Sequence, residues 1–269
     1  MTVNRDTKIL FFDIDGTLIT NDERKFLPDS TKRAIGMARE RGHLAFINSG
    51  RVLVNIEEFI RDIGFDGYVC GCGTYIAVHG QELLHHIVPK ERCYEIAKKA
   101  RECGMMTIFE HTGHTAYDRE MQEGGNKEIL DYFRSMKRKL IDDIESPEFC
   151  FDKFATWYDP KNDRVEEFKA YVAEDFTCIQ REGSFLEVVP KGFSKATGIE
   201  FLLSRYQIPL SQAYVFGDSN NDLEMLQYVP NSIAMGVCTP EVEAVASYKT
   251  DTVMNDGIYK AMKHFGVIG

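Results

Sequence analysis

The chain has 269 residues, 43% of them hydrophobic, which is enough for one large domain or two smaller ones with a real core. Its net charge of −10 argues against general binding to nucleic acid or to an anionic membrane surface, because both would repel it. No apolar run approaches bilayer-spanning length, and the first residues lack the apolar region of a signal peptide.

Seven cysteines are spread along the chain without the spacing of a small disulfide scaffold. This usage is typical of reduced thiols in a cytoplasmic protein. We therefore expect a cytoplasmic protein without a nucleic-acid or membrane partner. The sequence leaves its oligomeric state open.

In the first 83 residues, strand-like and helix-like segments alternate. Ile9-Leu10-Phe11 predicts a buried strand, and a helix is expected after Pro28, with Asp29 or Ser30 as its N-cap. The next expected elements are a strand at 44–48, a helix at 52–63, a strand at 68–70 and a hairpin of 74–78 with 83–84. This alternation predicts a parallel sheet with right-handed crossovers.

From about residue 84 to 190, helices alternate instead with antiparallel strand pairs. We expect helices at 90–103, 126–139 and 161–174, and strands at 105–110, 115–118, 151–158, 176–180 and 185–189. The first pattern then resumes, with helices at 194–206, 220–228, 240–246 and 257–264 and strands at 213–216, 232–235 and 252–254.

An insert of this length is too long for a loop, since structureless loops beyond ~15 residues are uncommon. The predicted fold class is therefore α/β, with a doubly wound parallel-sheet (Rossmann-like) core interrupted by an α+β module. The core would be discontinuous, formed by residues 1–83 and 191–269, and the inserted module would span residues 84–190.

Two carboxylates follow the first predicted strand. Asp13 and Asp15 are two residues apart and are followed by Gly16 and Thr17. Like charges this close raise each other's energy unless a cation or a shared proton relieves them. Taken alone, such a pair also fits an exposed loop.

A second acidic cluster, Gly217-Asp218-Ser219-Asn220-Asn221-Asp222, directly follows the predicted strand at 213–216. In an open parallel sheet, ligands bind outside the carboxyl ends of the strands. Mg²⁺ prefers carboxylates, waters and phosphate oxygens. We therefore predict that Asp13, Asp15 and Asp218 converge in a magnesium site.

The two acidic motifs resemble the first and fourth motifs of the haloacid dehalogenase-like hydrolases, chiefly the Cof-type phosphatases with a type IIB cap. Ser49-Gly50-Arg51 resembles the second motif, and 186–195 resembles the segment that leads to the third-motif lysine. We assign that lysine to Lys195, with Lys191 as the weaker candidate. The resemblance spans nearly the whole chain and implies that the insert is a cap that covers the site and selects the substrate.

The resemblance also implies roles for individual residues. Asp13 would attack phosphorus to form an aspartyl-phosphate, and Asp15 would act first as acid and then as base. Mg²⁺ would be held by the side chains of Asp13 and Asp218 and by the backbone carbonyl of Asp15. Asp222 would support these ligands without binding the ion itself. The residues expected to contact the phosphoryl group are Ile14, Ser49, Gly50, Lys195 and Asn221.

Three local features stay open at this point. Arg51 fits either a structural ion pair or a substrate contact. His111 and His114, three residues apart in a glycine-containing loop, fit a metal site or, more commonly, a solvated turn. Cys72-Gly73 stands where related chains commonly carry Asn-Gly, so we expect a polar substrate contact to be missing there.

The expected function is that of a Mg²⁺-dependent phosphatase acting on small phosphorylated metabolites, such as sugar phosphates or phosphorylated cofactors. One alternative is a sugar phosphomutase of the same superfamily. Another is a catalytically silent protein that binds phosphometabolites, although Asp13, Asp15 and Lys195 are all retained. Dehalogenation is disfavoured because that branch lacks the second aspartate, here Asp15.

Overall fold

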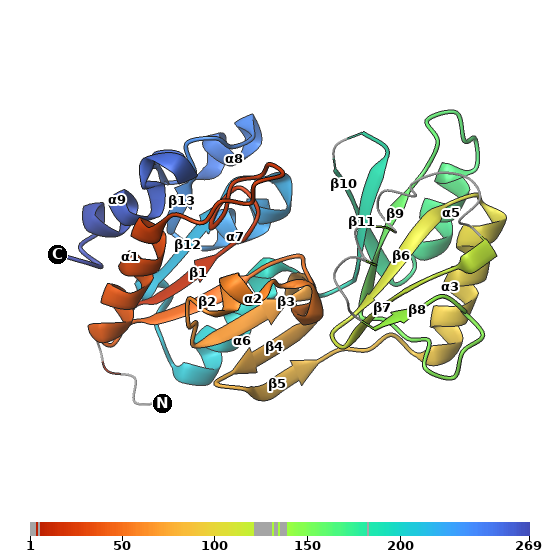
Figure 1. Ribbon diagram of the computed structural model, residues 1–269, viewed down its shortest axis with the longest axis horizontal. Helices are drawn as coiled ribbons and strands as arrows, with labels where there is room; N and C mark the ends of the chain where they lie inside the picture. The colour runs from red at the N-terminus through yellow and green to blue at the C-terminus, as the bar shows by residue number, and fades with distance from the viewer. Residues whose placement is uncertain (1–3, 5, 121–130, 132–133, 135–138, 182) are drawn as a thin grey trace. The chain divides into compact units, whose positions relative to one another are not determined.

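The computed structural model describes residues 4, 6–120, 131, 134, 139–181 and 183–269. It divides into two compact units, which we call the core unit and the cap unit (Figure 1). The core unit comprises Met1–Arg51, Ile56–Leu84 and Ser194–Gly269, and the cap unit comprises Val52–Asn55 and His85–Phe193. The short segment 52–55, which the sequence placed in the core, thus groups with the insert.

The core unit is built on an eight-stranded sheet in the order β14-β13-β12-β1-β2-β3-β4-β5. The strands are β1 (Ile9–Phe12), β2 (Leu44–Asn48), β3 (Gly67–Cys70), β4 (Tyr75–Val78), β5 (Gln81–His85), β12 (Ala213–Gly217), β13 (Asn231–Ala234) and β14 (Tyr248–Lys249). Neighbours from β14 through β3 run parallel, and β4 is antiparallel to β3. Because β1 lies between β12 and β2, the segments that follow these three strands meet at one edge of the sheet.

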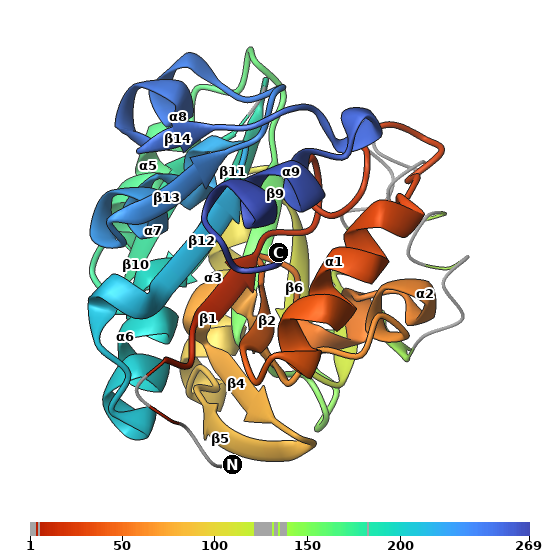
Figure 2. The same cartoon turned by 90° about the vertical axis from the view of Figure 1, so that its left-hand side faces the viewer.

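Helices cover both faces of this sheet, as Figures 1 and 2 show. On one face, α1 (Asp29–Glu40) packs beside α9 (Gly257–His264); on the other lie α6 (Lys195–Tyr206), α7 (Leu223–Tyr228) and α8 (Pro240–Val245). Side chains alternate along β1, so Ile9 and Phe11 join the core beneath α6 and α7. The predicted α/β fold class is confirmed.

The cap unit holds a six-stranded sheet in the order β10-β11-β9-β6-β7-β8. The strands are β6 (Met106–His111), β7 (His114–Tyr117), β8 (Leu140–Ile141), β9 (Lys153–Trp157), β10 (Phe176–Gln180) and β11 (Phe185–Pro190). All neighbours are antiparallel except β7 and β8. Helices α3 (Lys90–Glu102) and α5 (Val165–Val172) pack on one face, over an apolar core that contains Phe109, Phe154 and Phe168.

The opposite face of the cap sheet buries a charged cluster. Lys153 is only 3% exposed, and its Nζ lies 2.9 Å from Glu110 Oε2 and 2.8 Å from Glu187 Oε1. Asn55 Nδ2 donates a further hydrogen bond to Glu110 Oε1 (3.1 Å). Two buried carboxylates therefore share one ammonium group.

The predicted helix over 52–63 is wrong. The chain forms a 3₁₀ turn at Leu53–Asn55 and a short helix α2 at Glu58–Arg61. The apolar side chains of Val52, Ile56 and Ile60, four residues apart, are all buried. The helical spacing therefore reflects burial and not a continuous helix. The backbone is extended at Glu57 (φ −66°, ψ 150°), and the carboxylate of Glu57 forms ion pairs with Lys25 and Arg51.

Two other expectations also fail. The predicted strand at 252–254 is instead the start of a 3₁₀ turn, Val253–Asn255, because only one of its side chains is buried. Helix α1 is preceded by Pro28 as N-cap, without a side-chain cap from Asp29 or Ser30. The predicted helix at 126–139 falls mostly outside the described residues.

Among the described residues, no helix combines the length and apolar character needed to cross a membrane.

We expect Lys153→Met to lower the free energy of unfolding of the cap unit by about 3–5 kcal/mol, because it removes the buried ammonium group that contacts both Glu110 and Glu187. Urea unfolding followed by the fluorescence of Trp157, the chain's one tryptophan, measures this change. As a control, Lys169→Met removes a pair with the exposed Glu166 and should cost less than about 1 kcal/mol. Equal stability of the two variants would contradict the expectation.

Candidate active site

The first acidic motif forms a tight turn at the end of β1. The N–H of Asp13 donates to the carbonyl of Phe216 in β12 (3.1 Å), which fixes the aspartate at the strand end. The N–H groups of Leu18 and Ile19 then both donate to the carbonyl of Ile14 (2.9 and 3.1 Å). Ile14 itself is fully buried.

Gly16 lets this turn approach the second acidic motif. Its φ is +80°, and a Cβ added there would lie 2.4 Å from Asp218 Oδ2. Thr17 Oγ1 donates a hydrogen bond to the other oxygen of Asp218, Oδ1 (3.1 Å). The turn after β1 therefore packs against the Asp218 carboxylate in the loop after β12. Only glycine fits at position 16, because a Cβ there would collide with this carboxylate.

Lys195 begins helix α6, and its position is fixed by the helix cap. The Ser194 hydroxyl accepts from the N–H of Thr197 (3.3 Å), and the Thr197 hydroxyl accepts from the N–H of Ser194 (2.9 Å). Asn48 Nδ2 at the end of β2 donates to the Lys195 carbonyl (3.0 Å). Lys191, the weaker sequence candidate, is exposed and belongs to the cap unit.

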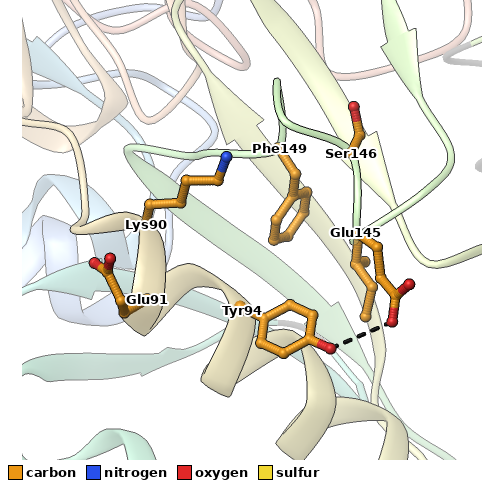
Figure 3. A pocket seen from close by; sticks show the side chains of 7 residues that line it. Lys90, Glu91, Tyr94, Glu145, Ser146 and Phe149 are labelled. Atoms are coloured by element: carbon orange, nitrogen blue, oxygen red, sulfur yellow. Dashed lines mark hydrogen bonds between the residues drawn. The ribbon is translucent and has the colours of Figure 1, made fainter.

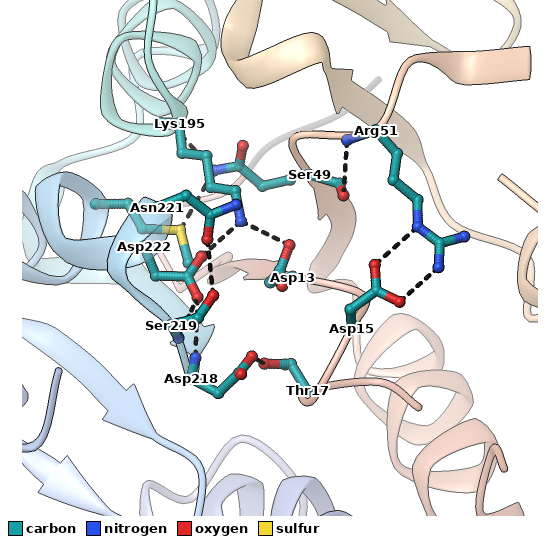
Figure 4. A network of polar contacts seen from close by, with 12 residues as sticks. Asp13, Asp15, Thr17, Ser49, Arg51, Lys195, Asp218, Ser219, Asn221 and Asp222 are labelled. Atoms are coloured by element: carbon teal, nitrogen blue, oxygen red, sulfur yellow. Dashed lines mark hydrogen bonds and ion pairs between the residues drawn. The ribbon is translucent and has the colours of Figure 1, made fainter. Parts of the chain in front are cut away.

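The Lys195 ammonium group joins two aspartates, as Figure 4 shows. It is 1% exposed, and its Nζ lies 2.6 Å from both Asp13 Oδ1 and Asp222 Oδ1. The second oxygen of Asp222, Oδ2, accepts from the N–H groups of Asp218 (2.9 Å) and Ser219 (3.1 Å). Asp222 therefore orients both the lysine and the loop after β12, and both of its oxygens are engaged.

This cluster carries more negative than positive charge. Asp13, Asp218 and Asp222 each place one carboxylate oxygen within 4.8 Å of the others. Among the described residues, Lys195 is the one cation in ion-pair contact with them. Three buried carboxylates thus lie close to a single ammonium group, which contacts Asp13 and Asp222.

The pKa values follow from this crowding. Burial raises the pKa of Asp13 to about 7; the charge of Lys195 opposes this shift, and Asp222 and Asp15 add to it. Burial, together with the charges of Asp13 and Asp222, raises the pKa of Asp218 to about 8. Burial alone would lower the pKa of Lys195, but the neighbouring aspartates outweigh it and raise that pKa.

Asp15 is turned toward Arg51 rather than toward the cluster (Figure 4). Its two carboxylate oxygens accept from Arg51 Nη2 (2.5 Å) and Nε (2.8 Å). Arg51 Nη1 also donates to Glu57 Oε2 (2.5 Å), and Lys25 Nζ donates to Glu57 Oε1 (2.9 Å). Of the two interpretations left open for Arg51, the structure shows the ion pair.

The remaining predicted residues make local contacts. Ser49 Oγ accepts from the N–H of Arg51 (3.2 Å), and Asn221 Oδ1 accepts from Ser219 Oγ (2.9 Å). Gly50 lies between Ser49 and Arg51 and is buried. Cys72 is buried with φ +55°, and its N–H donates to the Ser49 carbonyl (3.1 Å), so it supports the same loop.

Sequence reasoning missed Thr17 and Asn48. Thr17 stands inside the first motif, and a hydroxyl beside two carboxylates was the available signal. Asn48 ends β2, and its Oδ1 is buried without a hydrogen-bond partner among the described residues. Its contact with the Lys195 carbonyl joins positions 147 apart in the sequence, so no local pattern indicates it.

A hollow on the cap unit, shown in Figure 3, is lined by Lys90, Glu91, Tyr94, Ile144, Glu145, Ser146 and Phe149. Tyr94 Oη donates to Glu145 Oε1 there (3.3 Å). This lining does not contain a nucleophile paired with a base. We therefore place the chemistry in the core unit.

Residues 10–262 match the family model of the haloacid dehalogenase-like hydrolases. The chain belongs to this family. It is 30% identical over 275 residues to YkrA of Bacillus subtilis (strain 168), which is provisionally named a phosphatase, covering 98% of this chain and 99% of that protein. It is 25% identical over 276 residues to YcsE of the same organism, named as a 5-amino-6-(5-phospho-D-ribitylamino)uracil phosphatase, covering 98% and 99%.

The structure is also similar to that of the subclass IIB sugar phosphatase BT4131. The TM-score is 0.80 at 29% sequence identity, and the alignment covers 97% of this chain and 100% of that one. The predicted family, its IIB cap class and the prediction of an enzyme of the phosphatase type are confirmed.

We expect Gly16→Ala to lower phosphatase activity at least about 100-fold, because its Cβ would displace the Asp218 carboxylate by roughly an ångström. The control is Gly42→Ala, where φ is +82° but nothing lies within 4 Å of an added Cβ. Both changes strain the backbone, and only the first touches the site. Similar turnover by the two variants would refute the role of Gly16.

Proposed function

We propose that the chain is a Mg²⁺-dependent phosphatase that hydrolyses small phosphorylated metabolites through an aspartyl-phosphate on Asp13. The observation that carries this proposal is the pairing of Asp13 with the buried Lys195 beside Asp218. Lys195 binds Oδ1 of Asp13, while Oδ2 has no hydrogen bond from the described residues. The lysine therefore holds the carboxylate and leaves one oxygen for attack.

Asp13, Asp218 and the backbone carbonyl of Asp15 are the groups we propose to hold Mg²⁺. Their oxygens are the hard donors that this ion prefers, and the excess of buried negative charge in the cluster calls for a cation. Asp222 has both oxygens engaged, so we assign it to supporting Asp218 and Lys195. When bound, Mg²⁺ would offset the repulsion between the Asp13 carboxylate and the phosphate of the substrate.

In this proposal the carboxylate of Asp13 forms a bond to phosphorus while the bond to the ester oxygen breaks. Asp15 gives a proton to that oxygen, and it then takes one from the water that hydrolyses the aspartyl-phosphate. To carry the first proton, Asp15 has to leave its two-point ion pair with Arg51, because that pair engages both of its carboxylate oxygens.

The other residues of the site would hold the transferring phosphoryl group. Lys195 supplies charge, and the hydroxyl of Ser49, the amide of Asn221 and the backbones of Ile14 and Gly50 supply hydrogen bonds. Stabilising the equatorial oxygens is most of what a protein contributes to phosphoryl transfer.

The names of the relatives support small phosphorylated metabolites as substrates. One is named for a sugar phosphatase activity and another for the phosphatase of a phosphorylated ribitylaminouracil. We propose the same broad class for this chain. A phosphomutase remains the alternative outcome of the test.

The test is phosphate release from a panel of sugar phosphates, nucleotides and phosphorylated cofactors. We expect release with Mg²⁺, loss of release in EDTA, and a loss of at least about 1,000-fold in Asp13→Asn, because the nucleophile is removed. Asp29→Asn, at a side chain 96% exposed, is the matched control and should retain full activity. Conversion of a sugar monophosphate to its positional isomer without phosphate release would favour the mutase.

A further inference from the structure

A second group of metal-binding side chains lies in the cap unit, at the hairpin between β6 and β7. His111 ends β6 and His114 begins β7, and the two residues are paired across the turn, with ring centroids 4.4 Å apart. Cys150 and Asp152 lie just before β9, the strand that pairs with β6. The group thus gathers side chains from separate segments of one unit.

The donor atoms of this group are close together, on residues that are buried or half-buried. One donor atom each from His111, His114 and Cys150 lies within 4.8 Å of the others. His114 is 6% exposed, and the side chain of His111 is largely buried. The histidines therefore do not form the solvated turn that the sequence allowed.

The hydrogen bonds of the two imidazoles indicate which nitrogens can bind a metal. Nε2 of His114 donates to the carbonyl of Cys150 (3.1 Å), which leaves its Nδ1 with a lone pair. Nδ1 of His111 accepts from the N–H of Gly113 (3.0 Å), so its proton is on Nε2, which faces Asp152 Oδ1 at 3.9 Å. Metal-binding histidines typically direct their second N–H to a carbonyl or a carboxylate in this way.

The carboxylate of Asp152 supplies a second, independent indication of a cation. Asp152 is 0% exposed, and its oxygens accept from His85 Nε2 (3.0 Å) and from the N–H of Thr112 (2.8 Å). Within the described ranges its ion-pair partners are histidines, not lysine or arginine. Histidines carry a positive charge only when protonated, whereas a metal ion on the neighbouring donors would supply a lasting counter-charge to this buried carboxylate.

We propose that His111 Nδ1, His114 Nδ1 and Cys150 Sγ bind one divalent transition-metal ion of the Zn²⁺ class. The Cys150 carbonyl would support His114, and the Asp152 carboxylate would support His111. Imidazole and thiolate donors favour Zn²⁺ over Mg²⁺, so this site is chemically distinct from the oxygen-donor site of the core unit. The ion would tie the β6–β7 hairpin to the segment before β9.

Binding requires limited changes in the hairpin. Tetrahedral Zn²⁺, with bonds of about 2.1 Å to nitrogen and 2.3 Å to sulfur, places its donors about 3.3–3.6 Å apart. Donor atoms that lie as far apart as 4.8 Å therefore have to close by up to about 1.5 Å. His111 Nδ1 exchanges its hydrogen bond from Gly113 for the metal, and the Cys150 thiol releases its proton to solvent.

The experiment is a titration of the metal-stripped full chain with Co²⁺, in excess Mg²⁺ to occupy the acidic site. Co²⁺ bound to a thiolate gives an intense near-ultraviolet charge-transfer band, which oxygen donors alone do not give. We expect a band that saturates at one Co²⁺ per chain, is displaced by Zn²⁺ and is lost in Cys150→Ser. Cys178→Ser, at a half-buried cysteine of β10, is the matched control and should retain the band.

A wild-type chain without the thiolate band, or a band that survives Cys150→Ser, would overturn the proposal. If Cys150→Ser does not fold, His114→Asn replaces it, with the fold checked by Trp157 fluorescence. We expect the folded His114→Asn variant to bind Co²⁺ at least about tenfold more weakly, because one of three ligands is removed. Unchanged Co²⁺ affinity in that variant would equally overturn the site.

Discussion

The constraint on which this structure depends is the burial of three carboxylates around one lysine ammonium group. Asp13, Asp218 and Asp222 come from the ends of two adjacent strands, and Lys195 comes from the first turn of α6. Buried charges of this kind are tolerated only when partners at defined positions compensate them. The helix cap at Ser194 positions Lys195, the close approach at Gly16 leaves room for Asp218, and the N–H groups after β12 orient Asp222. The local structures of three segments therefore position the same charged cluster.

The sequence predicted the framework of this site because its chemistry is tied to strand ends. Apolar runs followed by DxDGT and GDSNND place carboxylates at the same edge of a parallel sheet, and the predicted helix at 257–264 matches α9. Two features of the site depend instead on tertiary contacts. The helical spacing of 52–63 did not reveal the extended backbone at Glu57, because that break depends on Arg51 and Lys25. The role of Asn48 depends on a carbonyl in α6 and has no local signal.

The two units differ in the chemistry that they offer to metal ions. The core unit presents carboxylate oxygens with an excess of negative charge, which suits a hard cation beside a phosphate. The cap unit presents imidazole nitrogens and a thiol beside a buried carboxylate. From the sequence, His111 and His114 fitted two interpretations because the distinguishing groups, Cys150 and Asp152, lie far along the chain. Tertiary structure brings those groups together. His114 then hydrogen-bonds to the Cys150 carbonyl and His111 lies near Asp152, contacts that a surface turn would not make.

The central claim is that Asp13 becomes phosphorylated, and the most direct measurement uses Asp15→Asn with p-nitrophenyl phosphate and Mg²⁺. Nitrophenolate leaves without a proton, so the first step should proceed, while loss of the base slows hydrolysis of the intermediate. We expect a burst of one nitrophenolate per chain and a phosphoryl group on the peptide that contains Asp13. A folded Asp15→Asn variant that binds the substrate but shows neither the burst nor a phosphorylated Asp13 would contradict the account.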